Sequence, residues 1–421
     1  MRSRSPAPVR PVTPEFRFWS PPADPDKPPC PYRTGFTVDI KPHIPPAPFG
    51  GQAYGSTPRA IVSQYDLRTL RQTELVLANP PLETADPPTS QIHTLSVTRE
   101  LAVADDRDAQ LVLCNIKPKS PVDDGLPFQA VAKIYDPLYY SFPHKDVPSV
   151  PCDVTWSADQ DYSREAAAYE HLQTIGQAGS FAPKYFGSWT FALSLQMGNA
   201  TKQTPPQSRP VRLILIEYIP GKSLRELCAG PAPIPASTFS EAYRLEVLAR
   251  ILDGEAMLRF KGINQRDLAA RNVILFSDEQ MEAQPEEFNN PIPPRSTPVI
   301  PYDGTTLPPN PMWTYWKDDL QGFDGWIPTG WETNSRLRQE WLKERFGGDN
   351  LTKYAPIREE LEFDEYSAPE QLPTPLWGAG THNACQVKPV LQEPPGVTNL
   401  SSAVHMYWDW NAQRRNNDDK K

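Results

Sequence analysis

The stretch GINQRDLAARNVILF, residues 262–276, decides how the rest of the chain is interpreted. It places a carboxylate, Asp267, five residues before a carboxamide, Asn272, and then runs into apolar residues that end at Phe276. A long amphipathic segment precedes it, so the order predicted here is helix, polar turn and short strand. Such a turn can be purely structural. Carboxylate and carboxamide oxygens are, however, also the ligands that a hard cation prefers.

The segments upstream of this stretch predict a sheet interrupted by one helix. Strand composition and alternation occur at residues 91–101, 109–117, 128–136, 182–195 and 211–219. Helical spacing occurs at 161–175, 237–252 and 335–348. In the second of these helices, Thr238 and Glu241 have the spacing of a capping box. Strands gathered in the first half, with a helix between the third and fourth, indicate an α+β fold.

Four motifs follow one another along these elements. The third strand ends in VAKIYD with Lys133, and the next helix contains SREAAAYEHL with Glu165. The fifth strand ends in LILIEYIPGKSL, and NQRDLAARNVI belongs to the stretch quoted above. In this order the motifs resemble those of the protein-kinase-like superfamily. The likeness is greatest to a group of fungal proteins with a degenerate kinase domain, related to choline and aminoglycoside kinases.

This resemblance implies a two-lobed fold, in which an antiparallel sheet with one helix precedes a reduced, mostly helical C-lobe. It also implies ATP and Mg²⁺ as cofactors, since phosphoryl transfer needs positioning and charge neutralisation above all. The implied site residues are Asp267 as catalytic base, Lys133 on the phosphates with Glu165 as its partner, Glu217, Tyr218 and Ile219 at the adenine, and Asn272 and Asp303 on magnesium.

Three departures weaken the resemblance. The turn between the first two strands reads AVADDRDAQ, so acidic side chains stand where kinases have glycines that approach phosphates closely. Gln265 stands where the family usually has a histidine. Asp303 lies in PVIPYDGTTL, where an Asp-Gly pair is as typical of a turn as of a metal site.

Proline content sets the expected domain boundaries. The chain has 51 prolines in 421 residues, and 14 of them fall in the first fifty. We therefore expect residues 1–57 to be a disordered tail and 351–421 to be mostly disordered, with residues 1–57 and 375–421 dispensable for folding. Residues 58–350 would form the kinase-like domain, with an N-lobe at about 90–219 and a C-lobe at about 220–350.

Charge and cysteine content narrow the classes of partner. The net charge of −9 argues against nucleic acid, which needs a basic surface. No apolar run is long enough for a membrane span. Five scattered cysteines without metal-ligand spacing indicate a reducing compartment, so a cytoplasmic or nuclear location is expected.

Function stays open between three interpretations. The first is a nucleotide-binding kinase-like protein that transfers phosphate, and the second is an inactive pseudokinase scaffold whose proline-rich tails recruit protein partners. The third is a small-molecule phosphotransferase. A tryptophan cluster that includes Trp313, Trp326 and Trp341 is expected to pack the floor of the reduced C-lobe, although an aromatic partner surface is the alternative.

Overall fold

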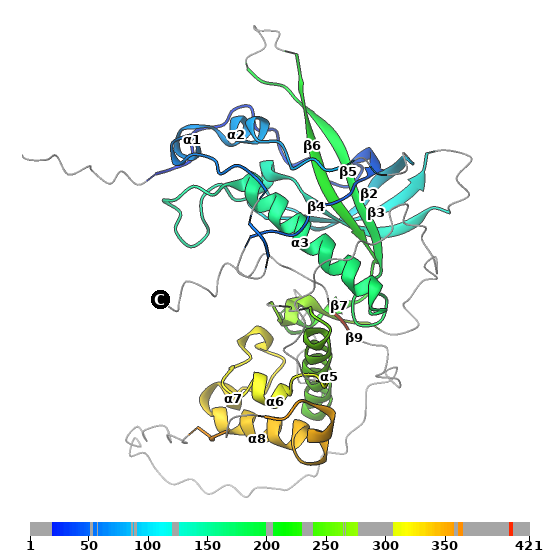
Figure 1. Ribbon diagram of the computed structural model, residues 1–421, viewed down its shortest axis with the longest axis vertical. Coiled ribbons are helices and arrows are strands. Elements are labelled where there is room, and N and C mark those ends of the chain that lie inside the picture. Colours follow the sequence, from blue (N-terminus) through cyan, green and yellow to red (C-terminus); the bar gives the residue numbers. More distant parts are fainter. Residues whose placement is uncertain are drawn as a thin grey trace, which may run out of the picture.

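In a computed structural model of the protein, a closed antiparallel sheet lies beside a helical part (Figure 1). The described residues are 19–50, 54–56, 58–85, 87, 91–119, 126–198, 205–229, 239–263, 265, 267–276, 306–357, 361–364 and 404–406. Within these residues, no helix has the length and apolar character needed to cross a bilayer. The architecture is therefore mixed, with antiparallel strands and helices.

Six strands close into one sheet. Their bounds are β1 Thr37–Pro42, β2 His93–Ala102, β3 Gln110–Pro118, β4 Phe128–Tyr135, β5 Tyr185–Leu195 and β6 Gln207–Ile216. Their spatial order is β1-β2-β3-β4-β6-β5, and β1 pairs with both β2 and β5. All five strands expected from the sequence are present at nearly the expected positions, and β1 is an addition.

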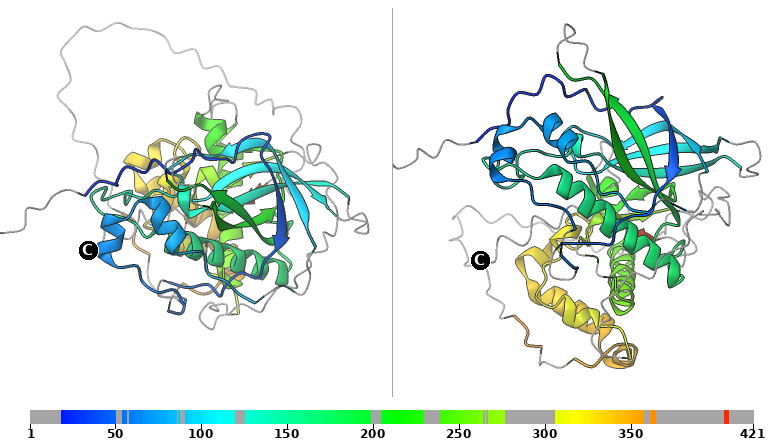
Figure 2. Two further views of the ribbon diagram at one scale, coloured as in Figure 1. Left: turned by 90° about the horizontal axis from the view of Figure 1, so that it is seen from above. Right: turned by 45° about the horizontal axis from the view of Figure 1, so that its top comes forward.

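The helix α3, Val154–Thr174, packs along the sheet and contacts β4, β5 and β6 (Figure 2). One face of α3 is buried against the sheet, since Ala166, Tyr169 and Leu172 are fully buried. The helix begins seven residues before the expected start because the Asp153 side chain accepts a hydrogen bond from the backbone N–H of Trp156 (3.0 Å).

The expectation that residues 1–57 form a disordered tail is wrong for the described part of that range. Strand β1 completes the sheet, and Tyr32 and Ile40 are fully buried. The hydroxyl of Tyr32 donates to Asp136 Oδ2 (2.5 Å), and Arg209 also pairs with Asp136. Proline is compatible with this arrangement because Pro42 lies at the end of β1, where a missing N–H costs little. Two short helices follow, α1 Gln64–Thr69 and α2 Gln72–Ala78.

The helical part is built around α5, Glu241–Phe260. The other helices of this part are α4 Leu224–Ala229, α6 Pro311–Thr314, α7 Gly330–Thr333 and α8 Ser335–Phe346, with 3-10 turns η3 Ala270–Asn272, η5 Gln321–Phe323 and η6 Gly348–Lys353. A further 3-10 turn, η1 Pro137–Tyr139, follows β4 and contacts α2 and α3. Ser240 caps α5 by accepting from the N–H of Tyr243 (3.2 Å), so the capping box expected at Thr238 and Glu241 is wrong.

A small sheet of order β7-β8-β9 lies between the closed sheet and α5 (Figure 1). Its strands are β7 Lys222–Ser223, β8 Val273–Leu275 and β9 Val404–Met406. Strand β9 comes from a range expected to be mostly disordered, 351–421. Within the same range, the ring centroids of Phe363 and Trp316 are 5.2 Å apart, and the Tyr354 hydroxyl donates to Asp253 Oδ1 (2.8 Å). The expected boundary at 350 is therefore too early.

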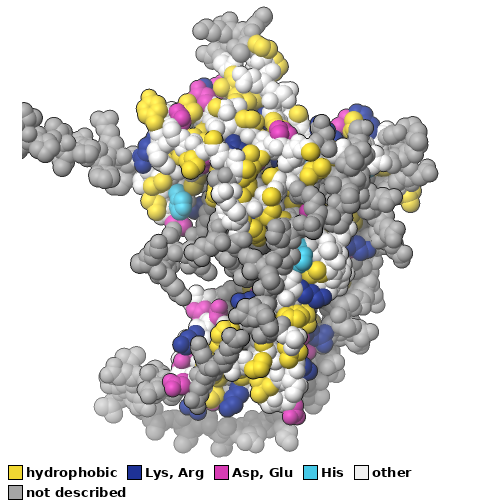
Figure 3. All heavy atoms as spheres, in the orientation of Figure 1, with side chains coloured by type: hydrophobic (Ala, Val, Ile, Leu, Met, Phe, Trp, Pro, Cys, Tyr) yellow, Lys and Arg dark blue, Asp and Glu magenta, His cyan; other side chains and the backbone are white. Residues whose placement is uncertain are grey.

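The tryptophan cluster divides between core and surface. Trp326 is fully buried and Trp316 and Trp331 are nearly so, which confirms a packed aromatic floor at those positions. Trp341 is half-buried. Trp313 is 43% exposed, so the expectation that it belongs to the core is wrong. On the face shown in Figure 3, Lys and Arg side chains are interspersed with Asp and Glu.

Candidate functional site

Lys133 lies on β4, between Leu111 of β3 and Ile214 of β6. Its side chain is 3% exposed, and Nζ lies 2.9 Å from Oε1 and 2.7 Å from Oε2 of Glu165 on α3, which is 1% exposed. The expected approach of the two side chains to within about 4 Å is therefore confirmed. Successive side chains of a strand point to opposite faces of the sheet. This alternation along β4 places Lys133 on the face that α3 covers, where it meets Glu165.

Tyr135 is a second donor to Glu165 that the sequence did not reveal. Its hydroxyl lies 2.7 Å from Oε2, two residues along β4 and therefore on the same face as Lys133. Burial raises the pKa of Tyr135 well above its usual value, and the nearby Glu165 raises it further. Tyr135 thus stays protonated and donating, and Glu165 is held from two sides.

The turn between β2 and β3 lies at the end of the sheet that carries Lys133, since Gln110 immediately precedes Leu111. The fully buried Gln110 side chain closes this turn. Its Oε1 accepts from the N–H of Ala104 (2.9 Å), and its Nε2 donates to the carbonyls of Ala104 (2.9 Å) and Arg107 (3.1 Å). Asp108 in the same turn forms an ion pair with Lys145 (2.6 Å). The acidic turn is thus internally braced.

The segment Glu217, Tyr218 and Ile219 follows β6. The N–H of Glu217 donates to the carbonyl of Lys184 (2.9 Å), and Glu217 Oε2 accepts from the N–H of Lys184 (3.0 Å). Burial raises the pKa of the Glu217 carboxyl. The N–H of Glu217 is therefore already used within the fold, and the carbonyl of Ile219 accepts from the N–H of Gly221 (2.9 Å).

Tyr218 is connected to β2 across the sheet. Arg99 Nη2 donates to the Tyr218 hydroxyl (2.7 Å), and its guanidinium lies 5.5 Å from the centre of the ring. The sequence gave no sign of this contact, because the two residues are distant along the chain and neither belongs to a motif.

Asp267 and Asn272 meet in the loop between α5 and β8. Asn272 Nδ2 donates to both the backbone carbonyl and Oδ2 of Asp267 (2.8 Å each), and Arg271 pairs with Oδ1. The Asp267 side chain is 12% exposed, and Asn272 is buried. The five-residue spacing thus brings the carboxylate and the carboxamide together, as the candidate site requires.

The segment of residues 320–322 packs closely against the loop that contains Asp267 and Asn272. A Cβ on Gly322 would lie 2.7 Å from the carbonyl oxygen of Leu268, so only glycine allows this close approach. Two residues earlier, the buried Leu320 has φ 57°, a left-handed conformation that is costly for a bulky residue. Its N–H donates to Asp318 Oδ1 (2.8 Å), which helps to hold that conformation.

Asp303, the expected second magnesium ligand, lies outside the described residues, and its role stays a prediction. Among the residues that are described, no group of three or more His, Cys, Asp and Glu side chains is arranged to hold a metal. Gln265 is buried in the loop before Asp267. Of the expected site residues, two pairs are therefore seen in contact, Lys133 with Glu165 and Asp267 with Asn272.

No protein-family model and no curated protein matches the sequence. One similar solved structure is a crystal structure of Rad53 1-466 in complex with AMP-PNP, with 13% identity and a TM-score of 0.25. The match covers 44% of this chain and 35% of that chain, so it spans about a third of the other protein's length. At this TM-score it does not establish a shared fold.

Proposed function

We propose that this protein is a kinase-like protein that binds ATP with Mg²⁺. The observation that carries the proposal is the buried ion pair between Lys133 and Glu165. Removing a lysine from water is costly, and an opposing carboxylate repays the cost only with good geometry. A buried cation beside a turn, held by a helix carboxylate, is a suitable arrangement for neutralising phosphates.

The loop of Asp267 and Asn272 supplies the second half of the proposal. A carboxylate that receives hydrogen bonds from its own loop is fixed in position, as a residue that orients an acceptor hydroxyl must be. Asn272, with Asp303 as the proposed second ligand, would offer oxygens to Mg²⁺. Backbone groups of residues 217–219 would bind the adenine, between the part of the chain that holds the closed sheet and the helical part.

Nucleotide binding is tested by thermal unfolding. A ligand that binds only the folded state stabilises it by about 2.7 kcal/mol at a hundred times its Kd. ATP with Mg²⁺ should therefore raise the Tm of the wild type by several degrees, and Lys133→Met should abolish most of that rise. Because this variant also breaks a buried pair, the ligand-induced rise is compared rather than the Tm itself. Lys119 follows the end of β3 and its side chain is 56% exposed, so Lys119→Met should retain the full ligand-induced rise in Tm.

Transfer is tested separately from binding. Asp267→Asn should keep the rise in Tm and lose transfer of the γ-phosphoryl group to water or an acceptor, whereas Asp349→Asn at an exposed position should keep both. Asp303→Asn should remove the Mg²⁺ dependence of binding. If no nucleotide shifts the wild-type Tm, with or without metal, the proposal is overturned.

A second candidate, the pseudokinase scaffold, is favoured by the braced turn between β2 and β3. Asp105 and Asp106 would repel phosphates, while Asp108 is paired with Lys145, and the buried Gln110 holds the turn in place. Asp105→Gly with Asp106→Gly should then create or strengthen ATP binding. An affinity for ATP that is unchanged in the double variant would show that the turn does not prevent ATP binding.

A further inference from the structure

A groove outside the proposed nucleotide site lies between the start of α5 and the segment that runs through α7 into α8. Its volume is about 640 Å³, which falls within the usual size of small-ligand pockets. Trp331 and Trp341 line it, with ring centroids 5.2 Å apart and planes inclined at 44°, so the two rings contact each other; Trp331 is 5% exposed, and the half-buried Trp341 offers the groove most of its indole surface. Leu245 and Ile327 add apolar surface. None of the residues proposed above to bind the nucleotide lines it.

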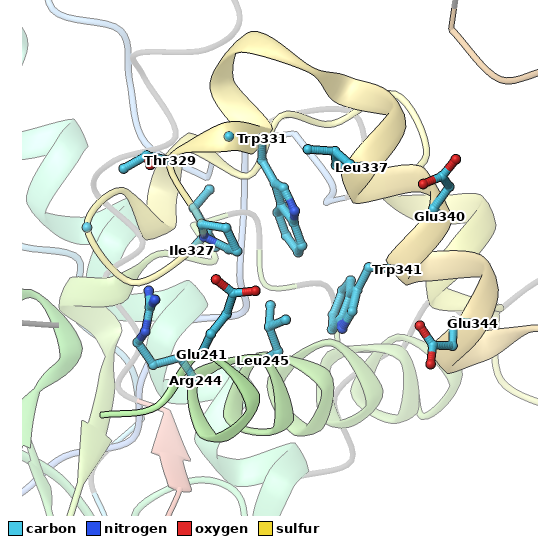
Figure 4. Close-up of a pocket in the computed structure, with 13 residues that line it drawn as sticks. Glu241, Arg244, Leu245, Ile327, Thr329, Trp331, Leu337, Glu340, Trp341 and Glu344 are labelled. Atoms are coloured by element: carbon cyan, nitrogen blue, oxygen red, sulfur yellow. The ribbon is translucent and has the colours of Figure 1, made fainter. Parts of the chain in front are cut away.

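Figure 4 shows the two indole rings and the carboxylate of Glu241 facing the same space, with Glu344 on the flank. Among the described residues, neither Glu241 nor Glu344 forms an ion pair with a cationic side chain. A third carboxylate, Glu340, is paired with Arg336 (3.0 Å). With three carboxylates and one guanidinium, that of Arg244, among its lining side chains, the groove has a net negative charge.

Arg244 is the one cationic side chain that lines the groove, and its guanidinium is hydrogen-bonded to the backbone. Arg244 donates through Nη1 to the backbone carbonyl of Trp326. The Trp326 indole N–H in turn donates to the carbonyl of Arg244 (3.0 Å), so this contact is reciprocal. Arg244 therefore has a structural partner of its own, and anions gain little from the groove.

We propose that this groove binds an alkylated ammonium group. Indole faces attract a cation through their quadrupole, and they favour one with a diffuse charge and apolar surface. A bare metal ion would find two carboxylates but aromatic walls in place of the remaining oxygen ligands. A neutral apolar ligand would leave the charge of Glu241 without a partner. The combination of two indoles and a carboxylate selects a methylated ammonium over either.

Binding is measured on the full chain by calorimetry, with tetramethylammonium as the probe and tert-butanol as a neutral molecule of similar shape. Tetramethylammonium should bind at millimolar concentration or below, and tert-butanol at least about tenfold more weakly, as the cation–aromatic contribution predicts. Equal affinities for the two, or no binding of tetramethylammonium, would overturn the proposal.

The variants separate charge from packing. Glu241→Gln keeps the side-chain volume and should weaken binding several-fold, and Trp341→Leu should weaken it about tenfold. Glu332→Gln, at an exposed carboxylate on α7 that does not line the groove, should leave the affinity unchanged. Because Trp341 is half-buried, ¹⁵N-indole NMR checks that its variant keeps the fold. Weakening by Glu332→Gln equal to that by Glu241→Gln would contradict a specific site.

The source of the ammonium is decided by a second pair of probes. A short peptide with one trimethyl-lysine is compared with free tetramethylammonium and with the unmodified peptide. Tighter binding of the methylated peptide than of both others assigns the groove to a methylated protein segment, and equal binding of peptide and free ion assigns it to a small cation. Preference for the unmodified lysine would overturn the proposal, since that ammonium is strongly hydrated.

Discussion

The closed sheet and the helical part handle charge in opposite ways. Two ion pairs inside the sheet are buried: Lys133 and Glu165 are 3% and 1% exposed, and Arg209 and Asp136 are 4% and 0% exposed, while the pair of Lys119 and Asp39 lies at the sheet surface. On the helical part, Arg336 and Glu340 are 50% and 52% exposed. Surface pairs contribute little to stability, whereas breaking a buried pair is costly. Buried charge is thus a feature of the sheet interior, and the floor of the helical part is packed with aromatic side chains.

The largest expected effect is on the closure of the sheet. Deletion of residues 1–44 removes β1 and Tyr32, and should abolish cooperative folding, because β2 and β5 would both lose a strand partner. Deletion of residues 1–18 should leave the thermal transition in place. Circular dichroism during heating compares the two. A cooperative transition in the longer deletion would show that the N-terminal segment is dispensable.

Next comes the buried charge that ties the N-terminal segment to the sheet. Asp136→Ala should destabilise the fold by about 3–5 kcal/mol in urea unfolding, because it leaves Arg209 buried without its carboxylate. The exposed Asp39→Ala serves as control and should leave the urea midpoint nearly unchanged. Equal losses of stability in the two variants would mean that the buried ion pair contributes no more to stability than the exposed one.

The aromatic packing of the helical part is tested by two tryptophans. Trp326→Ala should cost about 3–5 kcal/mol, since the side chain is fully buried, and Trp313→Ala much less, since it is 43% exposed. Urea unfolding measures both. A larger loss at Trp313 would reverse the assignment of core and surface made here.

The smallest effect expected is a pH dependence within the helical part. Burial raises the pKa of Glu255 on α5 to about 7, although Arg259 opposes the shift. The folded state therefore binds this proton more tightly than the unfolded state does, and stability should fall as the pH rises from about 4.5 to about 7, by at most about 1.4 kcal/mol per pH unit. Glu255→Gln should flatten this slope. A wild-type slope that the variant leaves unchanged would assign the effect to other groups.

The sequence predicted the local parts of this molecule better than its long-range parts. The strands and α3 follow from periodicity, and motif order sufficed to choose Glu165 as the partner of Lys133. Strand β1 was missed because it is short and lies among prolines, so its partners, not its composition, make it a strand. Tyr135 and Gln110 were missed because each acts through a hydrogen bond that alternation does not encode. The position of Asp303 is outside the described residues, so the metal site remains a proposal.

The closure of the sheet by β1 has a consequence for how the chain folds. During synthesis, Lys41 leaves the ribosome long before Thr190, the residue with which it pairs. Contacts between such distant residues slow folding, because the intervening loop must close before they form. Until then β1 cannot close the sheet, and the edges of β2 and β5 remain open to other chains. Because β6 lies between β4 and β5 and is the last of the six strands to be synthesised, its emergence should end the interval in which this protein most needs a chaperone.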